Sequence, residues 1–263
     1  QKVLDLNRHQ REFTLTWAQY RARVLNPGKL AGGASAFAAN RSLLVAVDRR
    51  FRVTPDVVVG IWGIESDYGA ITGNFNVVQS LATLGWDSGR PSFFRSELVS
   101  ALRILDHGDV GFAGMTGSYA GAMGQPQFMP DSYLRYAVDF DGSGRRDIWT
   151  SVPDVLGSIA NYLARNGWRY DEVWGQPVMA PSEINPALAG RERPRSLGEW
   201  MRLGVRRADG APFSEPLVRG ALLLPDGAGG EAFMVYPNFD VIRRYNPSDF
   251  YALAVGLLGS QSV

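Results

Sequence analysis

Glu65 is the side chain in this sequence that is best placed for acid–base chemistry, because it lies near the end of an apolar segment with helical spacing. At about 100° per residue, several apolar or aromatic side chains fall within about 60° of it on the helix surface. These are Val58, Ile61, Trp62 and, if the helix extends that far, Tyr68. Asp67 points to the opposite side, so we expect Glu65 to face the interior.

The apolar surroundings determine what Glu65 can do. A carboxyl group among apolar neighbours loses hydration of its charged form, so its pKa should rise, and a Glu with a raised pKa can donate a proton near neutral pH. The alternative is a Glu at a helix end that is hydrogen-bonded for a structural reason, since structural networks also perturb carboxylates. On this pattern alone the two interpretations have equal weight.

A glycine-rich segment, Gly117–Tyr133, is the second feature that could do chemistry. Its glycines leave the backbone open to close approach by a partner, and its side chains add neutral hydrogen-bonding groups. The glycines are Gly117, Gly121 and Gly124, and the polar residues are Ser118, Gln125, Gln127 and Tyr133. Neutral polar groups interleaved with aromatics suit an uncharged, hydroxyl-rich ligand such as a glycan. The alternative is a tight loop between helices, in which the aromatics fill the core.

The third feature, Asp139–Thr150, has the spacing of a calcium-binding loop. Oxygen ligands stand at loop positions 1, 3 and 5, a glycine at position 6 and a backbone carbonyl at position 7. These positions are held by Asp139, Asp141, Ser143, Gly144 and Arg145. Position 12 is Thr150 instead of the usual Glu, and Asp154 is the nearest acid that could replace it. The match favours cation binding, at modest affinity, over a simple turn.

Helices must position these three features, and the sequence predicts mostly helices before residue 175. The sharpest start signal is Thr54–Asp56, with a capping hydroxyl, a proline at the first helical position and an acid in the first turn. Gly69 is the corresponding stop signal. Helical spacing predicts segments at about 36–48, 55–66, 91–105, 130–137, 152–166 and 248–258.

After Trp174 the pattern changes, because seven prolines break the chain into short pieces before residue 226. Within this region Ala221–Leu224 and Glu231–Tyr236 flank a turn rich in Gly, Pro and Asp, which predicts a β-hairpin. We therefore expect a small β-containing module at about 176–236.

Composition and charge exclude several classes of protein. The 263 residues are 45% hydrophobic and 20% charged, an ordinary globular composition. A net charge of +1 gives no general attraction to nucleic acid, so no nucleic-acid partner is expected. The absence of cysteine excludes disulfides, thiolate metal sites and Cys nucleophiles. The longest apolar stretch, around Val57–Ile64, is far short of the roughly 20 residues that a membrane helix needs, so no transmembrane segment is expected.

Four segments, in order along the chain, resemble the B-type lytic murein transglycosylases, bacterial enzymes that cleave the glycan strand of peptidoglycan. Val59–Gly69 is similar to the family's catalytic-acid motif, a Glu at a helix end followed by Ser or Thr, a variable residue, an aromatic and Gly. Gly117–Tyr133 resembles its glycine-rich Gly-Ser-aromatic-Ala-Gly-Ala-Met-Gly segment. Asp139–Trp168 is similar to its calcium loop and the following helix, and Arg244–Ala254 resembles its C-terminal signature.

The resemblance, which covers about residues 55–258, implies a goose-lysozyme-like helical core. The expected fold is therefore mainly α (α+β), with additional helical segments and a small β module. Glu65 would be the sole acid/base. Residues implied to contact the glycan are Ser118, Met123, Gln127, Phe128, Tyr162, Tyr245, Tyr251 and, as a weaker match, Tyr20. Those implied to hold Ca²⁺ are Asp139, Asp141, Ser143, the Arg145 carbonyl and Asp154. Core packing is an open alternative for Tyr162 and Tyr251.

The resemblance also implies a reaction with one carboxyl group, whereas most glycosidases use two. Glu65 would protonate the glycosidic oxygen between N-acetylmuramic acid and N-acetylglucosamine, and the acetamido group of the substrate would stabilise the developing positive charge. The ionised Glu65 would then take the proton of the muramoyl 6-hydroxyl, which closes a 1,6-anhydro ring without water. The alternatives are a hydrolytic muramidase, a non-catalytic glycan-binding module and, least favoured, a calcium-dependent interaction protein.

Location, partners and domain organisation follow from the same resemblance. It implies a bacterial periplasmic enzyme whose leader is missing from this sequence, either soluble or trimmed from a membrane-anchored precursor. Peptidoglycan glycan strands are the expected partner, with other cell-wall enzymes as further candidates. A structural Ca²⁺ is the one cofactor considered, and no organic cofactor is expected. We expect an N-terminal helical segment 1–54, a lysozyme-like catalytic core with the calcium loop at 55–175, the β-containing module 176–236 and a C-terminal helix 237–263 that returns to the helical body.

The Arg-rich stretch Arg191–Arg207 is most simply a solvated charged face. Carboxylates of the peptide stems are the alternative ligands for it.

Overall fold

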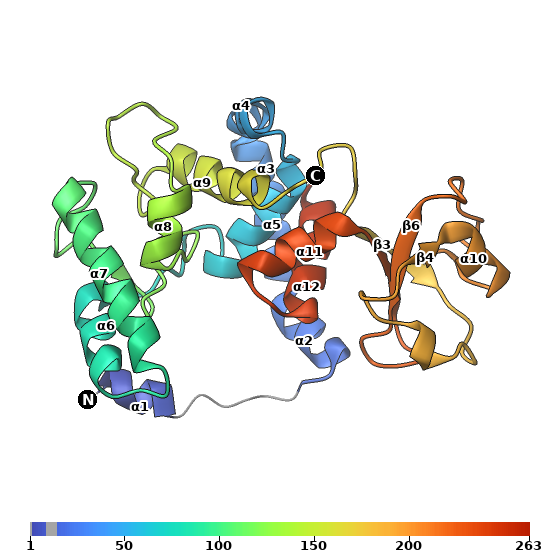
Figure 1. Ribbon diagram of the computed structural model, residues 1–263. Helices are drawn as coiled ribbons and strands as arrows, with labels where there is room; N and C mark the ends of the chain where they lie inside the picture. The colour runs from blue at the N-terminus through green and yellow to red at the C-terminus, as the bar shows by residue number, and fades with distance from the viewer. Residues whose placement is uncertain (1, 9–14) are drawn as a thin grey trace. The chain divides into compact units, whose positions relative to one another are not determined.

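The computed structural model describes residues 2–8 and 15–263, and α-helices dominate it (Figure 1). Residues 1 and 9–14, which fall in the predicted N-terminal segment 1–54, lie outside the described residues. The chain divides into two compact units, one built around residues 27–165 and 258–263 and the other around 166–257. The expected mainly α, α+β fold is confirmed.

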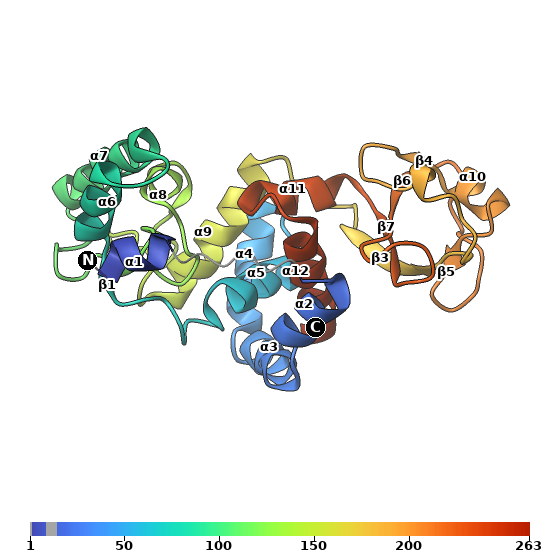
Figure 2. The same ribbon diagram turned by 90° about the horizontal axis from the view of Figure 1, so that it is seen from below.

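The first unit is almost entirely helical. Its elements are α1 (Lys2–Arg8), α3 (Pro27–Ala39), α4 (Arg41–Phe51), α5 (Pro55–Ser66), β1 (Phe75–Asn76), α6 (Val77–Trp86), α7 (Pro91–His107), β2 (Thr116–Gly117), α8 (Pro130–Tyr136) and α9 (Val152–Arg165). Helices α6 and α7 run side by side as a hairpin (Figures 1 and 2). Helix α5 packs against α3, α4 and α9, and every residue from 57 to 63 is buried. A helix that is apolar all round belongs in a core, so α5 forms the centre of this unit.

The second unit contains an antiparallel sheet of five strands in the order β4-β6-β7-β3-β5. Its elements are α2 (Trp17–Val24), β3 (Gly175–Met179), the 3-10 helix η1 (Pro186–Leu188), β4 (Arg195–Ser196), α10 (Leu197–Arg202), β5 (Arg206–Arg207), β6 (Arg219–Leu223), β7 (Ala232–Val235) and α11 (Pro237–Tyr245). The expected hairpin is confirmed, because β6 pairs with β7 and Leu222 lies opposite Met234. Trp200 of α10 packs into the same core and donates from Nε1 to Gly220 O at 2.9 Å. The last helix, α12 (Asp249–Ser262), begins in the second unit and ends in the first.

Most of the predicted helices are confirmed. Those expected at 55–66, 91–105, 130–137, 152–166 and 248–258 correspond to α5, α7, α8, α9 and α12. The single helix expected at 36–48 is wrong, because Asn40 separates α3 from α4 and the two helices meet at 78°. Asn40 leaves the helical conformation (φ −112°, ψ 15°), and its side-chain nitrogen donates to Ala36 O at 2.9 Å. Asn side chains compete in this way with the helical backbone hydrogen bonds.

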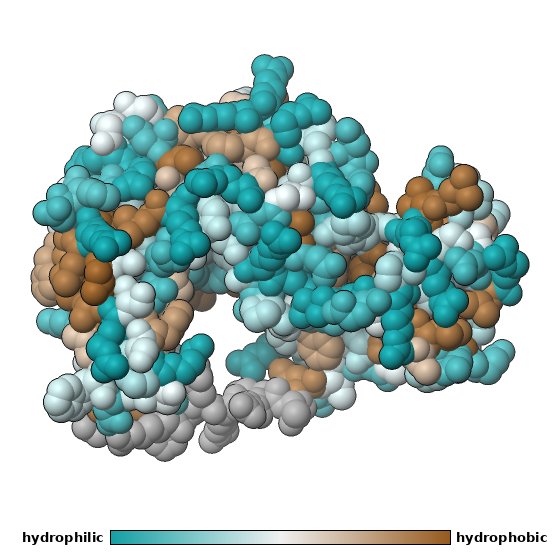
Figure 3. All heavy atoms as spheres, viewed as in Figure 1, coloured by the Kyte–Doolittle hydropathy of each residue, from teal (hydrophilic) through white to brown (hydrophobic). Residues whose placement is uncertain are grey.

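The surface carries apolar side chains in several places. Figure 3 shows them as brown areas over α7 and also on the second unit. On α7 they include Phe93, Val99 and Leu102, which are 39%, 49% and 49% exposed. Among the described residues, no single helix has the length and hydropathy of a membrane span. Helices α3 and α4 reach these values only when they are taken together, as a bent pair.

Candidate active site

Glu65 lies one residue before the end of α5, and its side chain is half-buried. The side chains that the sequence places on its face are buried: Val58, Ile61 and Trp62. Pro55 takes the first helical position as expected, and Thr54 has the backbone conformation of an N-cap. In the described part of the chain, however, no capping hydrogen bond reaches the Thr54 hydroxyl. The start of α5 therefore depends on Pro55 and on burial more than on a capping side chain.

Helix α5 ends just after Glu65, where two consecutive residues take the left-handed conformation. Asp67 has φ 52° and Tyr68 has φ 59°, conformations that cost about 1–2 kcal/mol each outside glycine. The Asp67 N–H donates to Gly63 O at 3.1 Å and the Tyr68 N–H to Trp62 O at 3.3 Å. The helix stops before Tyr68, so the condition under which Tyr68 would share the helical face of Glu65 is not met.

Tyr68 and Lys29 fasten this helix end to α3. The Tyr68 hydroxyl donates to Lys29 O at 2.8 Å, and its ring packs edge-on against Trp62 with 5.8 Å between centroids. Burial, helped by the charge of Asp67, raises the pKa of Tyr68 to about 12, so the hydroxyl remains a donor. Lys29 Nζ donates to Gly63 O at 2.7 Å and lies 3.2 Å from Asp67. A cation thus stands at the negative end of the helix dipole.

Gln125 joins α5 to the last part of the predicted calcium loop. Its Oε1 accepts from Trp62 Nε1 at 2.8 Å, and its Nε2 donates to Trp149 O at 3.0 Å. Its backbone N–H donates to Ile148 O at 2.9 Å. Gly69 leaves room for this side chain, because a Cβ there would lie 2.5 Å from Gln125 Oε1 and φ is +90°. The sequence identified Gln125 only as a neutral polar group. Its partners lie 63 and 24 residues away, so no local signal could reveal the bridge.

The glycine-rich segment folds tightly, and its first glycine is required by close backbone contacts. Strands β1 and β2 pair, and a Cβ on Gly73 would lie 2.3 Å from Gly117 O. A Cβ on Gly117 would lie 2.0 Å from Ala122 O. The Ser118 N–H donates to Ala122 O at 2.8 Å, and Ser118 Oγ accepts from the Ala122 N–H at 3.1 Å. These glycines therefore serve the tight loop itself, while Ser118 stays half-buried.

Gln127 holds this loop to the chain after α5. Its Nε2 donates to Thr72 O at 3.0 Å and to Gly124 O at 2.8 Å, and its φ of 52° places it in the left-handed region. Next to it, Met123 and Phe128 pair through their backbones as a β-bridge. Their side chains are 0% and 2% exposed, so both belong to the core beneath the loop.

Tyr162 of α9 is buried in an aromatic cluster. Its ring centroid lies 4.6 Å from that of Tyr136 and 5.8 Å from that of Phe128. The first unit thus contains six of the residues predicted for catalysis and glycan contact: Glu65, Ser118, Met123, Gln127, Phe128 and Tyr162.

Three further predicted residues belong to the second unit. Tyr251 of α12 is buried, and Tyr245 is half-buried at the end of α11. Tyr20 of α2 lies 5.7 Å from Phe250, measured between ring centroids. Helix α2 is held to its own unit by Asp226, whose carboxylate accepts from two N–H groups at the helix N-terminus at 2.6 and 2.9 Å.

The predicted calcium loop gathers its acids as the sequence indicates. Carboxylate oxygens of Asp139, Asp141 and Asp154 lie within 4.8 Å of one another. Burial raises the pKa of Asp154, and hydrogen bonds from three backbone N–H groups oppose this rise. Ser143 Oγ donates to Arg145 O at 3.3 Å, so these two oxygens are neighbours as well. A cluster of carboxylate, hydroxyl and carbonyl oxygens fits the hard-cation preference of Ca²⁺.

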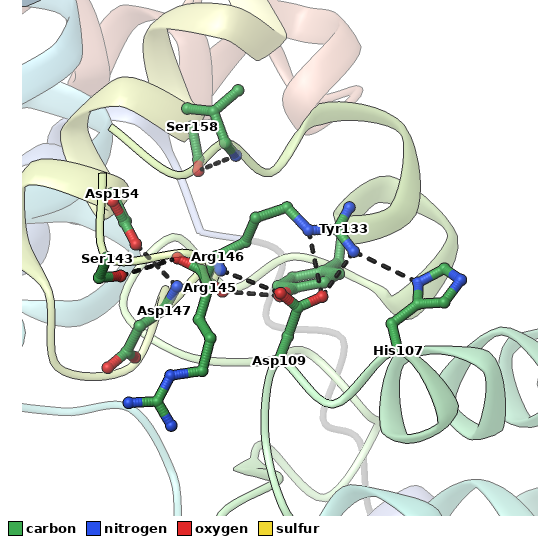
Figure 4. A network of polar contacts seen from close by, with 10 residues as sticks. His107, Asp109, Tyr133, Ser143, Arg145, Arg146, Asp147, Asp154 and Ser158 are labelled. Atoms are coloured by element: carbon green, nitrogen blue, oxygen red, sulfur yellow. Dashed lines mark hydrogen bonds and ion pairs between the residues drawn. The ribbon is translucent and has the colours of Figure 1, made fainter. Parts of the chain in front are cut away.

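Arg146 ties this loop to α7 and α8 (Figure 4). The Asp109 carboxylate accepts from its backbone N–H at 3.0 Å, from Nε at 3.1 Å and from Nη2 at 2.5 Å. The Tyr133 hydroxyl donates to Arg146 O at 2.6 Å, and His107 Nδ1 lies 3.4 Å from Nη2. Burial alone would raise the pKa of Asp109, but the hydrogen bonds and charge of Arg146 outweigh it and lower that pKa. Tyr133, a predicted polar group of the glycine-rich segment, is fully buried and serves this network.

A continuous set of contacts therefore runs from the acidic loop to the helix of Glu65. Asp154 accepts from the Asp147 N–H at 2.8 Å. The carbonyls of the next two residues bind Gln125, which in turn binds Trp62, three positions before Glu65. The loop and the candidate acid are thus parts of one hydrogen-bonded assembly.

Several solved structures that match this fold are lytic transglycosylases. SltB3 from Pseudomonas aeruginosa, in complex with NAG-anhNAM-pentapeptide, is 45% identical and superposes with a TM-score of 0.94 over 99% of this chain and 70% of that chain. The Escherichia coli lytic transglycosylase SLT35 in complex with calcium is 30% identical, with a TM-score of 0.84 over 99% of this chain and 82% of that chain. The fold is therefore of the lysozyme-like, lytic transglycosylase class.

The sequence comparison identifies the family. The Transglycosylase SLT domain family matches residues 1–260, and the chain belongs to this family. It is 33% identical over 245 residues to the membrane-bound lytic murein transglycosylase B of Escherichia coli strain K12. That match covers 92% of this chain and 66% of the relative, slightly less than two thirds of its length. The family predicted from the motifs is confirmed.

The bridge made by Gln125 can be tested by Gln125→Met, which keeps the side-chain length but leaves Trp62 Nε1 and Trp149 O without this partner. Each buried polar group that loses its hydrogen bond costs roughly 1–3 kcal/mol, so we expect the free energy of unfolding to fall by about 2–4 kcal/mol in urea denaturation. Gln79→Met, at an exposed position of α6, should change it by less than about 0.5 kcal/mol. Equal stabilities of the two variants would contradict the bridge.

The Asp109–Arg146 pair predicts a pH-dependent stability. Because the folded pKa of Asp109 is lowered, its contribution is complete above the unfolded value of about 3.9 and is lost as pH falls through the folded pKa. Asp109→Asn should therefore cost about 3 kcal/mol at pH 7 and clearly less at pH 3, measured by urea unfolding. Asp106→Asn, exposed on α7, should have little effect at either pH. A loss for Asp109→Asn that is the same at both pH values would refute the prediction.

Proposed function

We propose that this chain is a peptidoglycan lytic transglycosylase in which Glu65 is the only acid/base. The observation that carries the proposal is the position of Glu65 in a chain of this family: half-buried, one residue before the end of a buried helix whose end is fastened by Lys29, Tyr68 and Gln125. A fixed helix end holds a proton donor at one place, which is what positioning catalysis requires.

A one-carboxyl mechanism is supported by the partners of other acids in the same unit. Asp67 pairs with Lys29 at 3.2 Å, and Asp109 binds Arg146. Asp131 pairs with Arg135 at 2.9 Å. The acids of the calcium loop accept backbone hydrogen bonds within that loop. These carboxylates have structural partners of their own, so none of them is proposed as a second catalytic group.

In the first step Glu65 donates its proton to the glycosidic oxygen between N-acetylmuramic acid and N-acetylglucosamine. Val58, Ile61 and Trp62, which precede Glu65 on the same helix, are buried, so the proton donor stands at the edge of an apolar surface. The bond from the anomeric carbon to the leaving oxygen breaks, and the substrate's acetamido group stabilises the positive charge. Glu65 is then a carboxylate.

In the second step that carboxylate accepts the proton of the muramoyl 6-hydroxyl, whose oxygen bonds to the anomeric carbon and closes the 1,6-anhydro ring. Ser118 and Gln127, both half-buried, supply neutral hydrogen-bonding groups for the sugar. Met123, Phe128 and Tyr162 form the packed support close to it. For Tyr20, Tyr245 and Tyr251 of the second unit, the role as glycan contacts rests on the family resemblance.

A Ca²⁺ ion in the acidic loop would have a structural role. Asp139, Asp141, Ser143, the Arg145 carbonyl and Asp154 would hold it, and SLT35 was solved with calcium. The ion would neutralise the mutual repulsion of the acids and so stabilise the loop to which Gln125 is bonded.

The proposed substrate also sets the place of action. Peptidoglycan strands with peptide stems are the substrate by analogy with SltB3, whose complex contains a sugar–pentapeptide. Such a substrate lies outside the cytoplasmic membrane, so we propose a periplasmic enzyme, with other cell-wall enzymes as candidate partners.

Mass spectrometry of digested peptidoglycan tests the reaction. The parent chain should release anhydromuropeptides that are lighter by one water than hydrolytic products, and Glu65→Gln should release none above background. Glu183→Gln, an exposed acid of the second unit, should behave as the parent. Hydrated products would instead identify a muramidase, and products from Glu65→Gln would remove Glu65 from its role.

Thermal unfolding with and without Ca²⁺ tests the metal site. At a Ca²⁺ concentration 100 times the Kd, binding should add about 2.7 kcal/mol to the free energy of unfolding and raise the Tm, and chelation should reverse the rise. Asp141→Asn removes an exposed ligand and should abolish most of this response, while Asp106→Asn should keep it. An unchanged response of Asp141→Asn would show that the ligand assignment is wrong.

A further inference from the structure

The second unit contains a cavity of about 720 Å³ against its sheet, apart from every residue assigned above to glycan or calcium. Its walls come from the loop before β3, from β5, from the loop 213–218 before β6, and from the start of α11. Leu197, Phe213 and Tyr236, which are 4%, 6% and 9% exposed, form an apolar floor. The volume is typical of a site for a small molecule or a short chain.

A fixed polar group stands on this floor. The Tyr236 hydroxyl accepts a hydrogen bond from Gln176 Nε2 at 2.8 Å, which sets the position of the phenol oxygen. Burial raises the pKa of Tyr236, so the hydroxyl keeps its proton and can donate it to a ligand carbonyl. A pre-positioned donor of this kind confers specificity on an otherwise apolar cavity.

Some charged residues of the cavity wall form ion pairs, and others do not. Arg169 pairs with Glu172 at 3.1 Å, and Arg207 pairs with Asp209 at 3.0 Å. Among the described residues no ion pair is formed by Arg219, Glu215 or Asp171, and all three are exposed side chains of this wall. The mouth of the cavity therefore offers one cation and two carboxylates to a ligand.

The mouth also exposes apolar surface. Val173 is 62% exposed and Val218 is 43% exposed, and both line the cavity. Exposed apolar groups beside fixed polar ones are typical of a binding site.

We propose that this cavity binds the peptide stem of the peptidoglycan substrate. This stem is a short peptide that carries carboxylate groups as well as a free side-chain amine. Arg219 receives a carboxylate, Glu215 and Asp171 receive the amine, and the floor receives alanine methyl groups. An uncharged sugar would leave these charges unmatched, whereas a zwitterionic peptide matches both signs. This inference rests on the proposed function, because that function supplies the peptide-bearing substrate.

Peptide binding can be measured without any cleavage. The probe is the sugar-free synthetic pentapeptide Ala-γGlu-Lys-Ala-Ala, titrated into the full chain while backbone amide shifts are followed by NMR. Shifts should concentrate at residues 169–176 and 213–219. Arg219→Gln and Glu215→Gln should each weaken binding about tenfold, since each removes a charge-assisted contact. Arg202→Gln, an exposed arginine of α10 outside the cavity wall, should bind as the parent does.

Acetylation of the peptide's lysine gives the second test. It should weaken binding to the parent about tenfold and have little further effect on Glu215→Gln, because both changes remove the same contact. Absence of binding, shifts elsewhere in the chain, or unchanged affinity of both variants would overturn the inference. Anhydromuropeptide release is measured separately. A chain that cleaves but does not bind the peptide here loses only this inference, and one that binds the peptide but does not cleave loses the proposed function.

Discussion

The buried N–H of Trp62 is the constraint on which the arrangement of the first unit depends. A buried donor of this kind needs an acceptor, and Gln125 supplies it at 2.8 Å from a segment 63 residues further along the chain. The same amide uses its nitrogen on Trp149 O. Neither bond can be lost without leaving a polar group unsatisfied, so the end of α5, the glycine-rich segment and the last part of the calcium loop must keep one relative position.

This constraint explains why the acidic loop and the candidate acid share one unit. The loop concentrates three carboxylates within 4.8 Å, which is unfavourable unless hydrogen bonds and a cation offset their repulsion. Backbone N–H groups provide part of that compensation, and Arg146 holds the far side of the loop to Asp109 and Tyr133. Whatever orders the loop therefore also orders the residues that bind Gln125, and through it the helix of Glu65.

Local signals carried most of what the sequence predicted correctly. Pro55 and the apolar run after it defined α5, and the spacing of aspartates defined the acidic loop, because both depend on neighbours in the chain. Contacts between distant segments decided what was missed. Asn40 is the local exception, because its side chain bonds Ala36 O four residues earlier and breaks a helix whose apolar spacing continues through it. Tyr68 leaves the helix because α3 offers it a hydrogen bond and small residues. Gln125 resembles any loop glutamine until its partners are known.

The role of the charged run Arg191–Arg207 could not be decided from the sequence alone either. Taken from the sequence, it was either a solvated face or a site for peptide carboxylates, and its ion pairs now favour the first. Arg191 lies 2.6 Å from Glu192, Arg195 lies 3.9 Å from Glu199, and Arg207 pairs with Asp209. An arginine whose charge is matched nearby gains little from a further carboxylate, since both partners would have to be desolvated again. Recognition of a charged peptide in this unit therefore depends less on the density of arginines than on Arg219, which lies outside the run and has no ion-pair partner among the described residues.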